Sequence, residues 1–185
     1  MVMDIGENEA GQDGGIGNFL DDIYKSAFES NGFVLEIGVA TGTGSTVAVH
    51  NGLVKLEENG GEPLHVSVDE RDYMRAKPIV PWWHLVIGDS RHMSTYLKVT
   101  DICKDRKPGV IFIDTDHDYK QMKSELDIWR YIAGEETVWL FHDTHMFGFP
   151  NDDMVKAIEG FAEENGWVYE DWRPQPHGLG RMARR

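Results

Sequence analysis

The chain has 185 residues, a length that fits one domain of the usual size of about 100–200 residues. Asp and Glu number 32 against 18 Lys and Arg, and the net charge of −14 disfavours binding to nucleic-acid phosphates or to an anionic membrane. A single cysteine excludes a disulfide framework and no apolar run approaches the roughly 20 residues of a membrane span, so we expect a cytoplasmic protein without nucleic-acid or membrane partners.

The N-terminal residues 1–16 contain four acids, four glycines and no basic residue, which predicts a flexible acidic tail. A single domain is then expected over residues 17–185. From Asn18 onward, apolar side chains recur at helical spacing. The dipeptide Asn31-Gly32 supplies residues that accept the left-handed backbone at a helix end, so the domain is expected to begin with a helix.

Five short apolar runs then alternate with stretches of helical periodicity. The runs cover 33–39, 63–68, 83–88, 109–114 and 137–142, and the helical stretches cover 44–58, 90–104, 118–132 and 152–164. Strands that alternate with helices in this way form a parallel sheet covered on both faces. The last segments, 167–172 and 179–185, predict an antiparallel hairpin. The expected fold is α/β, a doubly wound, mostly parallel, seven-stranded sheet with helices on both faces and this C-terminal hairpin.

In a doubly wound sheet, ligands bind at the carboxyl ends of the strands, and the first such end is rich in glycine. The segment 36–45, EIGVATGTGS, follows an apolar run and opens a helical stretch. Gly38, Gly42 and Gly44 permit a tight turn and a close approach of a ligand to the backbone. Their GxxxGxG spacing differs from the GxGxxG pattern of dinucleotide-binding folds. A purely structural turn can look similar, but Glu36 before the first glycine favours a ligand-binding turn.

The next two strand ends each carry an acid. Asp69 follows the second run, 31 residues after Gly38, where a carboxylate can accept two hydrogen bonds from a ribose diol. A solvated loop acid is the alternative interpretation. The third run is followed by Asp89 and Ser90. Either side chain can cap the following helix.

Ionisable groups crowd the fourth and fifth strand ends. The fourth carries Asp114, Asp116 and His117 in the segment IDTDHDYK, where clustered carboxylates repel one another unless a cation or solvent lies between them. The fifth carries His142 and Asp143 in the segment LFHDTH. These strands are neighbours in the expected topology, so Asp114 and Asp143 should face one pocket. A hard divalent cation prefers such oxygen ligands.

Taken together, residues 18–185 resemble a class I S-adenosylmethionine-dependent methyltransferase with a Rossmann-like fold. The segments IFIDTDHDYKQMKSELDIW and LFHDTH are similar to those of cephalosporin-hydroxylase-like and sugar O-methyltransferases. The resemblance implies that S-adenosyl-L-methionine lies over the first three strand ends. Glu36 and the glycine turn then hold its methionine end, and Asp69 holds its ribose. Asp89 and Ser90 are implied at its adenine.

The same resemblance implies a magnesium ion on Asp114 and Asp143. Relatives often place a second acid or an asparagine beside the fifth-strand Asp, whereas this chain has His142 and Thr144 there. An imidazole ligand from His142 would shift the preference toward softer ions such as manganese. The metal site is therefore expected to hold Mg²⁺ or Mn²⁺ on Asp114, Asp143 and His142.

Two residues are candidates for the general base. Asp116 occupies the position of the base in one branch of the family, and His117 has a suitable intrinsic pKa of about 6.5. The expected acceptor is a hydroxyl of a small molecule or carbohydrate. It binds on an open face or in a site completed by a second subunit of a homo-oligomer.

Three other functions remain open at this point. A nucleotide-binding oxidoreductase suits the fold but not the GxxxGxG spacing. A metal-dependent hydrolase suits the Asp and His groups but leaves the glycine turn and Asp69 unexplained. A non-catalytic module would keep the cofactor pocket without turnover.

Overall fold

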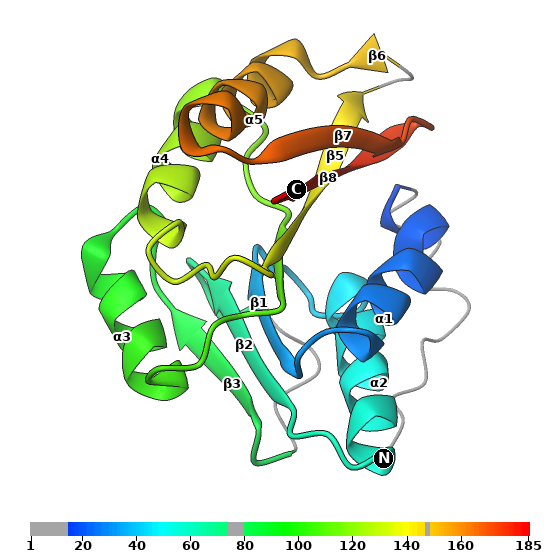
Figure 1. Cartoon of the computed structure of the whole chain (residues 1–185), viewed down its shortest axis with the longest axis vertical. Helices are drawn as coiled ribbons and strands as arrows, with labels where there is room; N and C mark the ends of the chain where they lie inside the picture. Colours follow the sequence, from blue (N-terminus) through cyan, green and yellow to red (C-terminus); the bar gives the residue numbers. More distant parts are fainter. Residues whose placement is uncertain (1–14, 74–79, 147–148) are drawn as a thin grey trace.

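A mixed β-sheet in the order β3-β2-β1-β4-β5-β8-β7 runs through the part of the chain that the computed structural model describes, residues 15–73, 80–146 and 149–185 (Figure 1). The strands are β1 (Phe33–Ile37), β2 (Leu64–Asp69), β3 (Trp83–Ile87), β4 (Val110–Ile113), β5 (Val138–Met146), β6 (Phe149–Pro150), β7 (Val168–Arg173) and β8 (His177–Ala183). The pairs from β3 through β5 are parallel, and β8 pairs antiparallel with both β5 and β7. The short β6 pairs with β5 outside this order. The predicted mostly parallel sheet with a C-terminal antiparallel hairpin is confirmed.

Helices cover both faces of this sheet. They are the 3-10 helix η1 (Ile16–Phe19) and the α-helices α1 (Leu20–Phe28), α2 (Ser45–Glu58), α3 (Met93–Cys103), α4 (Tyr119–Trp129) and α5 (Asp152–Asn165). One face carries α1 and α2, and the other carries α3, α4 and α5 (Figure 1).

The N-cap of α3 is His92, so the alternative in which Asp89 or Ser90 caps this helix is wrong. The Ser90 hydroxyl donates to Glu125 instead.

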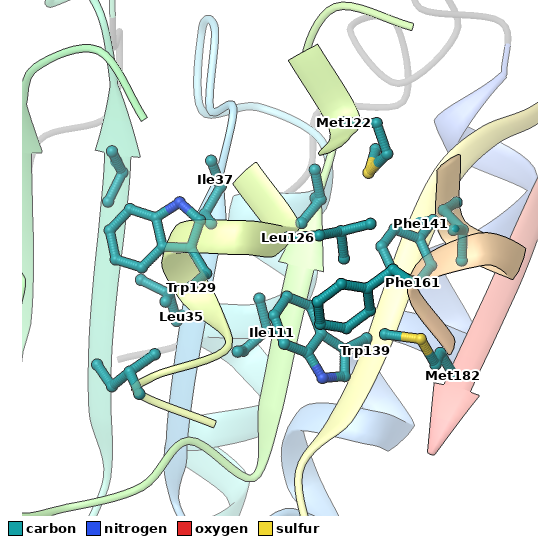
Figure 2. Packing of buried hydrophobic residues seen from close by; sticks show 14 of the residues in the cluster. Leu35, Ile37, Ile111, Met122, Leu126, Trp129, Trp139, Phe141, Phe161 and Met182 are labelled. Atoms are coloured by element: carbon teal, nitrogen blue, oxygen red, sulfur yellow. The ribbon is translucent and has the colours of Figure 1, made fainter. Parts of the chain in front are cut away.

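The apolar runs form central strands because consecutive side chains alternate between two buried faces. In β4, Ile111 and Ile113 join the core beneath α3, α4 and α5, whereas Val110 and Phe112 join the core beneath α1 and α2. Figure 2 shows the first of these cores, where the fully buried Trp129 of α4 lies beside side chains of the sheet. Each fully buried large apolar side chain contributes about 1.5–3 kcal/mol. Burial on both faces therefore fixes the strand ends that carry the polar residues.

Two segments of the chain are only partly covered by the described residues. Residues 1–14 of the predicted acidic tail lie outside them, while Gly15 and Ile16 at its end are buried. Residues 70–73 contain no helix, and 74–79 lie outside the described ranges. None of the described helices combines the length and the apolar character needed to cross a membrane.

Candidate active site

The glycine-rich turn after β1 has a backbone that favours glycine at two positions. Gly38 has a φ of +85° and Gly42 a φ of +70°, both in the left-handed region. A Cβ atom at Gly38 would collide with the backbone carbonyl of Asp114 at the end of β4. At Gly44, which precedes α2, a Cβ atom would lie 3.0 Å from the side chain of Ile16. The turn therefore brings the ends of β1 and β4 together without intervening side chains.

Glu36 lies beneath this turn and is fully buried. Its Oε1 accepts hydrogen bonds from Ser45 Oγ at 2.8 Å and from Thr46 Oγ1 at 3.0 Å, both on the first turn of α2. Its Oε2 accepts from Ser67 Oγ at 3.3 Å and lies 3.0 Å from His65 Nε2, both on β2. Glu36 thus fastens the start of α2 to the neighbouring strand.

Asp69 at the end of β2 also holds backbone. Its Oδ2 accepts from the amides of Val39 at 3.0 Å and Ala40 at 2.9 Å, and its Oδ1 accepts from the amide of Arg71 at 3.0 Å. Ala40 has a φ of +48°, an uncommon conformation for a residue with a Cβ atom. The carboxylate of Asp69 therefore fixes the glycine turn in its shape.

A cavity of about 290 Å³ lies over the carboxyl ends of β1 to β4. Of the residues predicted to hold the cofactor, Gly38, Asp69, Asp89 and Ser90 line it. The carboxylates in its lining are those of Asp69, Glu70, Asp89, Asp114 and Asp116. Glu36, Gly42 and Gly44 are not part of the lining and act through the turn that they support. The cavity therefore combines the predicted cofactor residues with Asp114 and Asp116 of the fourth strand end.

Asp89 is paired with Arg91. Arg91 donates from Nε to Oδ1 at 2.9 Å and from Nη2 to Oδ2 at 2.7 Å. These hydrogen bonds lower the pKa of Asp89 to about 2. Both carboxylate oxygens of Asp89 are therefore already engaged at the side of the cavity where the resemblance to methyltransferases implies an adenine.

A second buried carboxylate lies below the cavity, on α4. Glu125 is fully buried, and its Oε1 accepts from Ser90 Oγ at 2.5 Å and from Gln121 Nε2 at 2.7 Å. Its Oε2 accepts from Thr115 Oγ1 at 2.8 Å. Burial raises the pKa of Glu125, while the three hydrogen bonds act in the opposite direction. Glu125 thus ties together three side chains that line the cavity.

Asp114, His117 and Asp143 form a compact cluster, Asp114 and His117 after the end of β4 and Asp143 within β5 beyond its pairing with β4. Each offers one potential metal-ligating atom, and these atoms lie within 4.8 Å of one another. His117 Nε2 is 3.2 Å from Asp143 Oδ2 and 3.8 Å from Asp114 Oδ1. Burial opposes ionisation of Asp114, but the neighbouring imidazoles of His117 and His142 outweigh it and lower its pKa to about 2. The nearby carboxylate of Asp114 raises the pKa of His117.

Two more imidazoles adjoin the cluster. The buried His142 has its Nδ1 at 3.1 Å from Asp114 Oδ1 and at 3.4 Å from Asp143 Oδ2. His177 of β8 has its Nδ1 at 2.7 Å from Asp143 Oδ1, and its ring stacks on that of His142. Asp143 itself has a φ of +56°, a strained value that marks functional sites more often than ordinary strands. The predicted residues Asp114, Asp143 and His142 thus lie together.

The two candidates for the general base occupy different places. His117 belongs to the cluster, whereas Asp116 is exposed and lines the cavity. Asp118, which follows them, accepts hydrogen bonds from the amides of Lys120 and Gln121 and caps α4. In this segment, Asp118 therefore caps a helix, whereas Asp116 and His117 belong to the candidate site.

The sequence did not identify His177, Gln121, Thr115 or Glu125 as site residues. His177 reaches Asp143 because β8 returns antiparallel beside β5, with an irregular register between His142 and His145. Glu125 lies within a helix, where an acid usually faces solvent. The spacing of Gln121 and Glu125, four residues apart on one helix face, was the one signal available.

Several solved structures with a similar fold are methyltransferases. The chain is similar to CalS11, a calicheamicin methyltransferase, at 14% identity and a TM-score of 0.59, over 89% of this chain and 76% of CalS11. It is similar to the O-methyltransferase NovP at 10% identity and a TM-score of 0.61, over 89% of this chain and 78% of NovP. A structure of the MycE methyltransferase with Mg, SAH and mycinamycin VI matches at 11% identity and a TM-score of 0.61, over 90% of this chain and 48% of MycE. At these identities the likeness defines the fold, which is that of Rossmann-like methyltransferases.

A family model described as a methyltransferase domain matches residues 35–144. The chain therefore belongs to this methyltransferase family. The matched range runs from β1 through the glycine turn to Asp143 in β5. No curated protein matches the sequence. The predicted class of enzyme, a methyltransferase, is confirmed.

Proposed function

We propose that the protein is an S-adenosylmethionine-dependent O-methyltransferase, assisted by a divalent cation, that acts on a hydroxyl of a small molecule or carbohydrate. The observation that carries this proposal is the position of Asp114. Its carboxylate belongs both to the lining of the cavity and to the cluster with His117 and Asp143. A methyl donor in the cavity and a hydroxyl held at the cluster would therefore meet at one residue.

The cofactor half of the proposal assigns the cavity to S-adenosylmethionine. Gly38 lines the cavity, and Asp69 offers carboxylate oxygens for a ribose diol. Asp89 and Ser90 border the proposed adenine region, while Glu36 acts beneath the turn. The structures of MycE and CalO1 with bound SAH support this assignment by analogy of fold.

The donor set at the cluster fits a divalent cation. Two carboxylates and a neighbouring imidazole can together supply oxygen and nitrogen ligands at one point. Asp114, Asp143 and either His117 or His142 would hold the ion, and the imidazole widens the choice from Mg²⁺ to Mn²⁺. The MycE structure that contains Mg supports a metal in a site of this fold.

When bound, S-adenosylmethionine supplies an electrophilic methyl group and the cation supplies Lewis acidity that favours the ionised acceptor hydroxyl. His117 or Asp116 takes the hydroxyl proton. The sulfonium group would supply the methyl carbon to the acceptor oxygen, with S-adenosylhomocysteine as the leaving group. Asp114 and Asp143 hold the acceptor side in line, so the contribution of the protein is mainly positioning.

The proposed partners follow from the same site. CalS11, described in one structure as a TDP-rhamnose 3′-O-methyltransferase, supports a sugar hydroxyl as one acceptor class. The net charge of −14 argues against a nucleic-acid acceptor. A homo-oligomer and a cytoplasmic location stay predictions from the sequence.

Methyl transfer to a panel of sugars, polyols and catechols tests this function. We expect a methylated product from at least one acceptor, loss of turnover with EDTA, and recovery with Mg²⁺ or Mn²⁺. Turnover that is insensitive to EDTA would remove the metal from the proposal. Binding of S-adenosylhomocysteine without turnover on any acceptor would favour a non-catalytic module, and stabilisation by NAD alone would contradict the cofactor assignment.

A further inference from the structure

The amide of Gln121 lies at the side of the cavity proposed for adenine. Gln121 sits on the first turn of α4, and its side chain is 7% exposed while lining the cavity. Its Nε2 is 3.4 Å from Ser90 Oγ, so it adjoins the strand end that carries Asp89. Gln121 therefore reaches the same region of the cavity from α4.

Glu125 fixes which end of this amide faces the cavity. Glu125 Oε1 accepts from Gln121 Nε2 at 2.7 Å and from Ser90 Oγ at 2.5 Å. An amide turned by 180° would place Gln121 Oε1 against this carboxyl oxygen, where two acceptors repel each other. Among the described residues, no donor pairs with Gln121 Oε1. The amide thus presents its carbonyl oxygen as a free acceptor.

An adenine ring in this region needs an acceptor for its 6-amino group. Asp89 is the residue that the sequence suggests, yet both its oxygens already accept from Arg91. Gln121 Oε1 is neutral, nearly buried and held in one orientation, which makes it the better discriminator between a 6-amino and a 6-oxo purine. The Arg91 side chain that pairs with Asp89 is half-exposed by comparison.

We propose that Gln121 is the specificity-determining residue that reads the 6-amino group of the cofactor adenine, and that Glu125 is its positioning residue. This inference rests on the proposed function, since it requires an adenosyl cofactor in the cavity. It assigns roles to two side chains outside the glycine turn and the metal cluster. The hydrogen bond runs from the adenine amino group to Gln121 Oε1, while Glu125 prevents the amide from turning over.

Calorimetric binding of S-adenosylhomocysteine and S-inosylhomocysteine to the full chain tests this pair. For the unmodified protein we expect the adenosyl compound to bind at least about tenfold more tightly, because the 6-oxo group meets another acceptor. Gln121→Met keeps the length of the side chain but removes the acceptor. This variant should weaken the adenosyl compound about three- to tenfold and tighten the inosyl compound, because the acceptor that repels its 6-oxo group is gone.

Glu125→Gln tests the positioning role separately. An amide at this position can donate to Gln121 Oε1, so the Gln121 amide becomes free to turn its Nε2 toward the cavity. The inosyl compound should then bind more tightly than in the unmodified protein, and the preference for adenosyl should fall toward unity. A merely structural role for Glu125 would weaken both compounds equally. Lys120→Met, at an exposed neighbour on α4, is the control and should change neither affinity.

The outcomes separate this inference from the proposed function. If the unmodified protein binds neither compound, the proposed function fails and this inference fails with it. If it binds both equally, or if Gln121→Met keeps the full preference with a native circular-dichroism spectrum, only the role of Gln121 is overturned. If Glu125→Gln fails to improve inosyl binding, the positioning role of Glu125 is overturned.

Discussion

The acidic side chains along the rim of the cavity, at the strand ends, have different partners on its two sides. On β1, Glu36 accepts hydrogen bonds from hydroxyl groups and faces His65. On β2, Asp69 accepts hydrogen bonds from three backbone amides. At β4 and β5, Asp114 and Asp143 instead face imidazoles. These belong to His117, His142 and His177.

This difference separates scaffold from chemistry. Hydroxyl and amide donors, which do not titrate near neutrality, supply most partners of Glu36 and Asp69. The one imidazole beside Glu36, that of His65, is fully buried. Glu36 and Asp69 are therefore fixed parts of the fold. Imidazoles are themselves metal ligands and proton acceptors. The partners of Asp114 and Asp143 can therefore bind a cation or accept a proton from a substrate. Substitutions on the two sides should therefore have different consequences, for stability on one and for turnover on the other.

The largest expected effect lies on the scaffold side. Glu36→Ala leaves the donors around Glu36 unpaired in a fully buried position and should lower the free energy of unfolding by about 3–5 kcal/mol. Urea unfolding measures this change. Glu58→Ala, at an exposed acid of α2, is the matched control and should cost less than about 1 kcal/mol. Equal costs at the two positions would show that Glu36 is no scaffold residue.

On the chemical side, Asp114→Ala should lower methyl-transfer turnover by about 100-fold or more, because it removes a proposed metal ligand. The dissociation constant for S-adenosylhomocysteine should change by less than about threefold, because the glycine turn and Asp69 are untouched. Turnover and calorimetry measure the two quantities on the same preparation. Asp105→Ala, at an exposed acid, is the control. Equal losses of turnover and cofactor binding would contradict the separation of the two sides.

His177→Gln sharpens the boundary of the chemical side. Asp143 loses the imidazole at 2.7 Å, and partners of this kind change metal affinity about 10- to 100-fold. We expect an effect near the lower value because His177 is 44% exposed at its side chain. Titration of Mn²⁺ into the variant measures it. An unchanged affinity would restrict the chemical side to β4 and β5.

The smallest effect is expected far from the rim. The ion pair of Asp22 with Arg173 joins α1 to β7 and is partly exposed. Asp22→Asn should therefore cost less than about 1 kcal/mol of stability and leave turnover unchanged. A thermal melt and the turnover assay check both expectations, and a clear loss of turnover here would extend the functional region beyond the rim.

Much of the fold was predictable because the strands are buried on both faces and stand out as apolar runs. The rule that ligands bind at the carboxyl ends of such strands also predicts that Asp114 and Asp143 lie together. The buried strands and the grouping of residues at their carboxyl ends both follow from the local sequence and the expected topology, so one sequence is enough to predict them. The expected strand at 137–142 nevertheless stops short of β5, which continues to Met146.

The rest depended on burial and register. His177 comes to Asp143 only through the irregular pairing of β5 with β8, which no periodicity reveals. In the sequence, Glu36 resembles an acid that binds a ligand, and Glu125 resembles an acid on the exposed face of a helix. Both side chains are fully buried and hydrogen-bonded to other side chains. Ser90 likewise bonds to Glu125 rather than capping α3.

The central claim is that the Asp and His cluster holds a divalent cation beside the methyl donor. Calorimetric titration of Mn²⁺ into the unmodified protein and into Asp114→Asn and Asp143→Asn tests it most directly. We predict one site per chain that either substitution abolishes while the fold and S-adenosylhomocysteine binding persist. Equal Mn²⁺ affinity in all three proteins, or no Mn²⁺ binding to the unmodified protein, would contradict the claim.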